Sequence, residues 1–226
     1  MIFYQSAFFI SSTTLSACVP ASFKGGYKSV KALKPTIETS KVFDIQTEQT
    51  PNPQTLKFLP GEVVMEEGTA FYQNVEEAAD SPFARRLFGI EGVEGVFFGS
   101  DFITITKNET FEWQVMKPSV LGGIIDHFNS NDKTVEKATS KESEKSLEQN
   151  EDDSEIVKQI KELLDTRVRP AVAMDGGDII YNDFEDGIVY LKMQGACSGC
   201  PSSTATLKMG IENMLKHYIP EVQEVR

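Results

Sequence analysis

Ten residues near the C-terminus decide how the second half of the chain folds: Gly195-Ala196-Cys197-Ser198-Gly199-Cys200-Pro201-Ser202-Ser203-Thr204. Before them, Ile179–Phe184 and Ile188–Met193 are predicted strands, joined through Glu185-Asp186-Gly187. After them, a helix is predicted from Pro201 to about His217, because proline suits the first turn of a helix. The ten residues therefore form a loop between a β-hairpin and a helix.

Cys197 and Cys200 make this loop a candidate metal site. Two thiolates at C-x-x-C spacing on a tight loop can bind the same metal centre, and Gly195 and Gly199 permit the backbone geometry and the close approach of a bulky ligand. Cys200 also stands beside the start of the predicted helix, where free N–H groups and the helix dipole favour thiolate over thiol. We expect both cysteines to lie on an exposed loop.

From the spacing alone, a zinc site, a redox dithiol and an iron–sulfur cluster are about equally well supported. The chain has two histidines, His127 and His217, and neither is near the cysteine pair in the sequence. A Cys2His2 zinc site is therefore poorly supported. A thioredoxin-type dithiol belongs near an early strand of a βαβ unit, whereas this motif follows a hairpin late in the chain. A cubane cluster usually takes four thiolates, so it would require one C-x-x-C from each of two protomers.

The rest of the second domain completes an α-β-β-α order. Ile156, Ile160, Leu163 and Leu164 have helical spacing, and this helix is expected to end before Arg169-Pro170. Asp175-Gly176-Gly177-Asp178 is predicted to be a turn, in which a structural role for Asp175 and Asp178 is favoured over a functional one.

The first domain is predicted to have the order β-β-α-β-β-α. Its strands begin after Val42 and at Thr55–Leu59, with a turn at Pro51–Pro53 between them. Ser81-Pro82 is a good helix start. The remaining elements are paired strands at Gly95–Phe98 and Phe102–Thr106 and a helix near Ser119–Phe128. Phe97, Phe98 and Trp113 are assigned to the core, with a docking surface as the alternative.

Two segments lack the patterning of a folded domain. Residues 1–42 contain Ser, Thr and Lys and no acidic residue before Glu38, which is typical of a transit peptide. A bacterial lipoprotein site at Leu15–Cys18 and a secretory signal are the alternatives. Residues 129–153 are highly charged and nearly free of aliphatic side chains, so they are predicted to be a flexible linker, with a charged single helix as the alternative.

Composition excludes some classes of function. The net charge of −12 argues against nucleic-acid binding, and no apolar run is long enough to cross a membrane. We therefore predict an α+β protein with two small domains, 43–128 and 154–226, joined by a charged linker at 129–153 and preceded by a leader at 1–42.

Two motifs resemble those of the NifU-like (Nfu) family. Arg169-Pro170, Asp175-Gly176-Gly177-Asp178 and the segment Gly195–Ser203 are similar to the signature of the family's C-terminal domain. Residues Gln46–Pro53 and Leu56–Gly61 resemble the start of its N-terminal Nfu domain. The resemblance extends from about residue 43 to the end, apart from the linker.

The resemblance implies a mitochondrial-type iron–sulfur scaffold that is not an enzyme by itself. Cys197 and Cys200 would bind a [4Fe–4S] cluster shared in a homodimer, and a transient [2Fe–2S] form is left open. Its expected partners are upstream cluster-assembly proteins and apo iron–sulfur client proteins, in the mitochondrial matrix. The alternative is a thiol–disulfide oxidoreductase that uses the same two cysteines.

Overall fold

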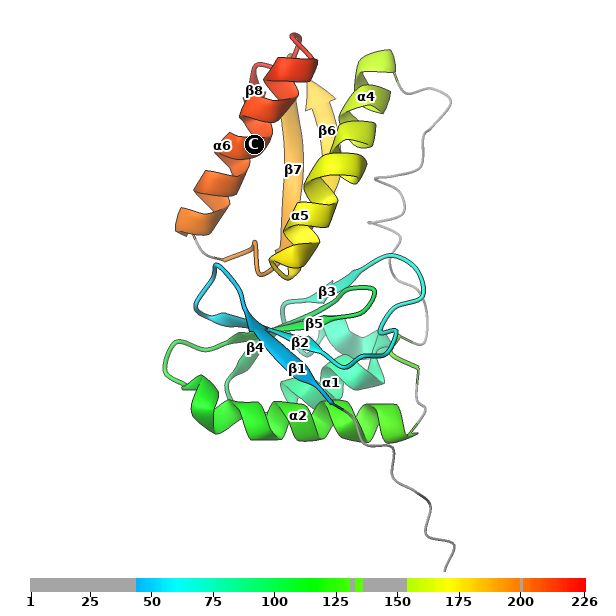
Figure 1. Cartoon of the computed structure of the whole chain (residues 1–226), viewed down its shortest axis with the longest axis vertical. Coiled ribbons are helices and arrows are strands. Elements are labelled where there is room, and N and C mark those ends of the chain that lie inside the picture. The colour runs from blue at the N-terminus through cyan, green and yellow to red at the C-terminus, as the bar shows by residue number, and fades with distance from the viewer. Residues whose placement is uncertain (1–43, 131–132, 136–153, 200) are drawn as a thin grey trace, which may run out of the picture. The chain divides into compact units, whose positions relative to one another are not determined.

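The computed structural model describes residues 44–130, 133–135, 154–199 and 201–226. The described residues belong to one compact unit, which contains two α+β domains with separate hydrophobic cores (Figure 1). The predicted leader and most of the predicted linker, residues 136–153, lie outside the described residues.

The N-terminal domain is built on an antiparallel sheet with the strand order β1-β2-β5-β4-β3. Its elements are β1 (Gln46–Gln49), β2 (Thr55–Leu59), β3 (Ala70–Tyr72), η1 (Glu77–Asp80), α1 (Pro82–Phe88), β4 (Val93–Phe98), β5 (Ile103–Lys107) and α2 (Trp113–Ser130). Ser81 caps α1 as predicted, because its Oγ accepts a hydrogen bond from Ala84 N at 3.0 Å.

The two faces of this sheet have different neighbours. Side chains on one face, including Phe58, Phe98 and Ile105, pack against α1 and α2 and form the core of the domain. Phe98 and Trp113 therefore have the predicted core role, Trp113 at the partly exposed edge. Phe97 points to the opposite face, as the period of two along β4 requires, yet it is also fully buried.

Two predictions for this domain need correction. The short strand β3 was not predicted, and it pairs with β4 at the edge of the sheet. Helix α2 begins six residues before the predicted start at Ser119 and contains Pro118 in its second turn. After α2, Ser81 Oγ donates to Thr134 O at 2.5 Å and Val135 packs on the core, so residues 133–135 remain attached to this domain.

The C-terminal domain consists of a three-stranded sheet and the helices that cover one of its faces (Figure 1). Its elements are α4 (Glu155–Leu163), the π-helical turn η2 (Leu164–Val168), α5 (Arg169–Met174), β6 (Gly177–Glu185), β7 (Ile188–Gly195), α6 (Pro201–Tyr218) and β8 (Glu224–Val225). The hairpin turns at Asp186-Gly187, both with positive φ, as a two-residue connection requires.

The first predicted helix, α4, ends at Leu163, before Arg169-Pro170 as expected, but the chain stays helical beyond it, which was not predicted. A π-turn follows α4, and Pro170 then occupies the first turn of α5, where its missing N–H costs no hydrogen bond. The helical run therefore continues to Met174. Strand β8 was not predicted either, and it pairs in parallel with the start of β7.

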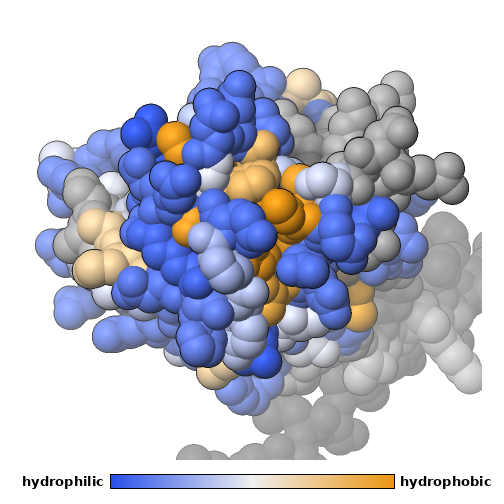
Figure 2. Space-filling view, turned by 90° about the horizontal axis from the view of Figure 1, so that it is seen from above, coloured by the Kyte–Doolittle hydropathy of each residue, from blue (hydrophilic) through white to orange (hydrophobic). Residues whose placement is uncertain are grey.

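The face seen in Figure 2 is largely hydrophilic, with a narrow hydrophobic strip near its middle. Among the helices of the described segments, none combines the length and the hydrophobicity needed to cross a membrane.

Candidate functional site

The cysteine loop, residues 195–200, connects β7 to α6. Gly195 and Gly199 have φ angles of +65° and +83°, a region that residues with a side chain rarely adopt. The glycines predicted to permit the loop geometry are therefore required by it. Cys197 lies between them, two residues after the end of the strand.

Hydrogen bonds hold the backbone of this loop in place. Ser198 donates to Gly195 O through both its backbone N, at 3.1 Å, and its Oγ, at 2.8 Å. Thr204, in the first turns of α6, donates to Cys197 O at 2.9 Å. Ala196 N donates to Gly176 O at 3.1 Å, which ties the loop to the turn before β6. The position of Cys197 is thus set from β6, β7 and α6 together.

Cys197 is buried, with 6% of its surface exposed, and it packs in the core of the C-terminal domain. The expectation of an exposed thiol is wrong for this residue, because Gly177 lets the start of β6 approach it closely. A Cβ atom at Gly177 would lie 2.8 Å from Cys197 Sγ. Burial, with the charges of Asp175 and Asp178, raises the pKa of the Cys197 thiol to about 12.

The other predicted ligand, Cys200, lies outside the described residues. Within the described ranges, no group of three or more His, Cys, Asp or Glu side chains is placed to hold a metal ion. His127, for example, is stacked on Phe83 in the N-terminal core, with ring centroids 3.8 Å apart. The candidate site of one chain therefore rests on the cysteine loop.

Asp178 has a clear structural role. Its carboxylate accepts hydrogen bonds from Arg169 Nε at 2.8 Å and Arg169 Nη2 at 2.6 Å, a bidentate ion pair between β6 and the start of α5. It also accepts from Ile179 N at 2.8 Å. Asp175, by contrast, is exposed at the C-terminal end of α5. Of the two aspartates, Asp178 is the one that fixes the turn next to Cys197.

Asn52 is a site residue that the sequence analysis missed. Its side-chain amide donates two long hydrogen bonds to the cysteine loop, to Ala196 O at 3.5 Å and to Ser198 O at 3.4 Å. These carbonyls lie on either side of Cys197, and Asn52 itself is 1% exposed. The Pro51–Pro53 turn was recognised in the sequence, but nothing local indicates what its asparagine contacts.

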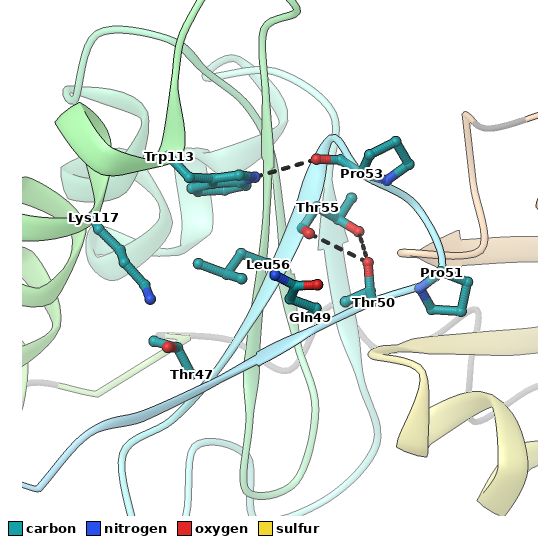
Figure 3. Close-up of a pocket in the computed structure, with 9 residues that line it drawn as sticks. All are labelled: Thr47, Gln49, Thr50, Pro51, Pro53, Thr55, Leu56, Trp113 and Lys117. Carbon is teal, nitrogen blue, oxygen red and sulfur yellow. Dashed lines mark hydrogen bonds between the residues drawn. The ribbon is translucent and has the colours of Figure 1, made fainter.

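The rest of the Asn52 loop is braced within the N-terminal domain. Asn52 Oδ1 accepts from Gln54 N at 3.0 Å, which leaves the amide NH2 group to face the cysteine loop. Trp113 Nε1 donates to Pro53 O at 3.3 Å, and Thr50 Oγ1 donates to Asn52 O at 2.9 Å. Trp113, Pro53 and Thr50 line a pocket of about 400 Å³. Figure 3 shows how these side chains lie around it.

Comparison with known proteins identifies both domains. Residues 45–131 match the family model described as "Scaffold protein Nfu/NifU N terminal", and residues 160–226 match the "NifU-like domain".

Similar full-length proteins carry related names. The chain is 54% identical over 182 residues to the human "NFU1 iron-sulfur cluster scaffold homolog, mitochondrial". This alignment covers 80% of this chain and 70% of the human protein. It is 52% identical over 186 residues to "NifU-like protein 4, mitochondrial" from Arabidopsis thaliana, covering 80% of this chain and 64% of that protein. The aligned region thus spans about two thirds of these relatives.

The order of the two matched domains agrees with the resemblance noted in the sequence, and the structure gives each its own core. The chain therefore belongs to the Nfu/NifU scaffold-protein family, with an Nfu-type N-terminal domain followed by a NifU-like C-terminal domain.

Proposed function

We propose that this chain is an iron–sulfur cluster scaffold or carrier. Cys197 and Cys200 of two protomers together hold one [4Fe–4S] cluster, which is then transferred to apo-proteins in the mitochondrial matrix. The observation that carries the proposal is the cysteine loop, whose backbone is held at several points around Cys197. The names of the human and Arabidopsis relatives support the cargo and the compartment.

The number of thiolates supports the shared arrangement. One chain offers the pair Cys197 and Cys200, whereas a cubane cluster usually takes four thiolates. A cluster that requires two protomers stabilises the dimer by mass action, so loading depends on protein concentration.

The buried state of Cys197 adds one step to this function. A thiol with its pKa raised to about 12 is protonated at neutral pH, and only the thiolate is a good ligand. Because only 6% of the surface of Cys197 is exposed, the loop must open for iron to reach its Sγ, and iron binding then displaces the thiol proton. The same burial gives no support to the oxidoreductase alternative, since reactive dithiols have lowered pKa values.

Anaerobic reconstitution with iron and sulfide tests the proposal. We expect a broad visible absorption, four irons per two chains by chemical analysis, and a dimer by light scattering. Cys197→Ala and Cys200→Ala are each expected to abolish stable loading, and Cys18→Ala serves as the matched control that loads normally. Alanine is used because a serine hydroxyl at the buried position 197 costs about 1–3 kcal/mol without a partner.

Circular dichroism of each variant shows whether the fold is retained. A monomer that carries four irons without added thiol would refute the shared cluster. Full loading of either cysteine variant would refute the ligand assignment.

A further inference from the structure

The outward face of the N-terminal sheet, the face opposite α1 and α2, is covered although none of the described helices of its own domain packs on it. Lys57 on β2, Phe97 on β4 and Thr104 on β5 are 7%, 1% and 1% exposed. None of the three is a member of the N-terminal core. We call Lys57, Phe97, Thr104 and the adjacent Asn52 the docking face.

The docking face contacts the end of the C-terminal domain that carries the cysteine loop. Lys57 Nζ donates to Ala173 O at 3.2 Å and to Met174 O at 3.1 Å, the last carbonyls of α5. Thr104 Oγ1 donates to Gly176 O at 2.7 Å. All three acceptors are main-chain carbonyls at or just after the C-terminal end of α5, where a cation such as Lys57 is favourable; Ala173 O and Gly176 O accept main-chain hydrogen bonds as well.

Two glycines allow the surfaces to approach. A Cβ atom at Gly195 would lie 3.0 Å from the ring of Phe97, and a Cβ atom at Gly176 would lie 2.8 Å from Thr104 Oγ1. Thr69 adds a hydrogen bond to Asp178 Oδ2 at 2.8 Å, so the carboxylate that fixes the turn also contacts the N-terminal domain. The contact is thus complementary in shape and in donors and acceptors.

The docked domain lies where a second protomer must approach. Asn52 bonds the carbonyls on both sides of Cys197 and is itself buried. A second cysteine loop can reach this side of Cys197 only after Asn52 has left it. The contacts are mainly hydrogen bonds, and such polar contacts between domains are typical of interfaces that open and close.

We infer that the docking face of the N-terminal domain is an intramolecular cap for the cysteine loop of the same chain. The capped state keeps Cys197 from partners, and undocking exposes the loop; this gating role rests on the proposed function, while the docking itself does not. The N-terminal domain, which contributes no cysteine within residues 44–130, thereby controls access to the ligands.

Two changes at the docking face, and one matched control, test the cap in the full-length apo protein. Asn52→Asp keeps the oxygen that accepts from Gln54 N and replaces the amide donor by a carboxylate facing two carbonyls. Lys57→Glu removes both hydrogen bonds to α5, together with the ion pair of 3.4 Å with Glu48 on β1. Lys117→Glu makes the same charge change on α2; Lys117 lines the pocket of Figure 3, on a helix that the docking face does not include, and has no ion pair among the described residues.

Backbone ¹⁵N relaxation reports docking. In the wild type and in Lys117→Glu we expect both domains to tumble with one rotational correlation time. In Asn52→Asp and Lys57→Glu we expect two shorter and unequal times. Independent tumbling in the wild type, or variants that tumble like the wild type while folded by their amide spectra, would overturn the inference.

Alkylation by iodoacetamide reports capping. The tryptic peptide of residues 193–208 contains Cys197 and Cys200 and separates them from Cys18. We expect its modification rate to rise about tenfold or more in the two docking-face variants, because each loses two hydrogen bonds between the domains. In Lys117→Glu we expect the rate to be unchanged. Equal rates in variants that do undock would refute the capping role. Neither readout uses a cluster, so failure of reconstitution would count against the proposed function alone.

Discussion

Neutralising Asp178 should destabilise the C-terminal domain, whereas neutralising its neighbour Asp175 should not. In Asp178→Asn the side chain keeps its shape and the oxygen that accepts from Ile179 N, but it loses the negative charge opposite Arg169. Both aspartates raise the pKa of Cys197, so the two variants remove a similar influence on the thiol. The two aspartates differ in that Asp178 is buried and forms an ion pair with Arg169, whereas Asp175 is exposed.

The magnitude follows from the geometry of the pair. The side chains of Arg169 and Asp178 are 18% and 6% exposed, and two hydrogen bonds of 2.8 and 2.6 Å join them. Removing one partner of a buried pair costs about 3–5 kcal/mol, because the remaining charge is left without compensation. Arg169 retains some access to water and a weaker contact with Asp165 at 3.4 Å, so the lower end, about 3 kcal/mol, applies.

Amide hydrogen exchange measures this cost for the C-terminal domain separately. A loss of about 3 kcal/mol speeds global exchange of the β7 and α6 amides roughly 150-fold. For the exposed Asp175→Asn we expect a change within about 0.5 kcal/mol. If the two variants exchange alike, the ion pair does not stabilise the turn and our structural assignment of Asp178 is wrong.

Two further changes, each with a control, test the close packing at Gly177 and the N-cap of α1 by the same exchange measurement. Gly177→Ala would place a Cβ atom 2.6 Å from Gln194 O and 2.8 Å from Cys197 Sγ, so we expect a loss of about 1–3 kcal/mol in the C-terminal domain. Gly210→Ala in α6 has open space around it and should instead stabilise by up to about 1 kcal/mol; equal effects would contradict the close approach at Gly177. Ser81→Ala removes the cap of α1 and the bond to Thr134 O and should cost about 1–2 kcal/mol in the N-terminal domain alone, whereas Ser130→Ala, at the exposed end of α2, should cost under about 0.5 kcal/mol. A loss that spreads equally to the C-terminal amides would show that the two domains unfold together.

Features with a local cause were predicted well from the sequence. Ser81-Pro82 starts a helix, and Asp186-Gly187 turns a hairpin, through the conformations of those residues themselves. The strand Thr55–Leu59 and the helix that begins at Pro201 also match. Each of these elements is specified by residues within a few positions of it.

Features with a distant cause were missed. Strand β8 has two residues, too few for a periodic pattern, and it forms because it pairs with β7 more than 30 positions earlier in the chain. The continuation of the helical run through Arg169-Pro170 was missed for a related reason. The bias of the residue before proline against helix was overcome by a π-turn, and Arg169 is then held by the ion pair with Asp178.

The candidate site divides along the same line. The C-x-x-C spacing and the two glycines are local, and they were sufficient to select Cys197 and Cys200 as candidate ligands. The burial of Cys197 was not predictable, because it depends on the close approach of Gly177. The contact with Asn52, which lies 144 positions away from Ala196, was not predictable either. A lysine at position 57 in an alternating strand indicates only that its face is not the core of its own domain. Lys57, Phe97 and Thr104 do share that face, and what covers it is another domain. A sequence pattern can therefore select candidate ligands, whereas in our proposal their accessibility depends on how the two domains dock, which is why the tumbling of the apo chain is the decisive measurement for this protein.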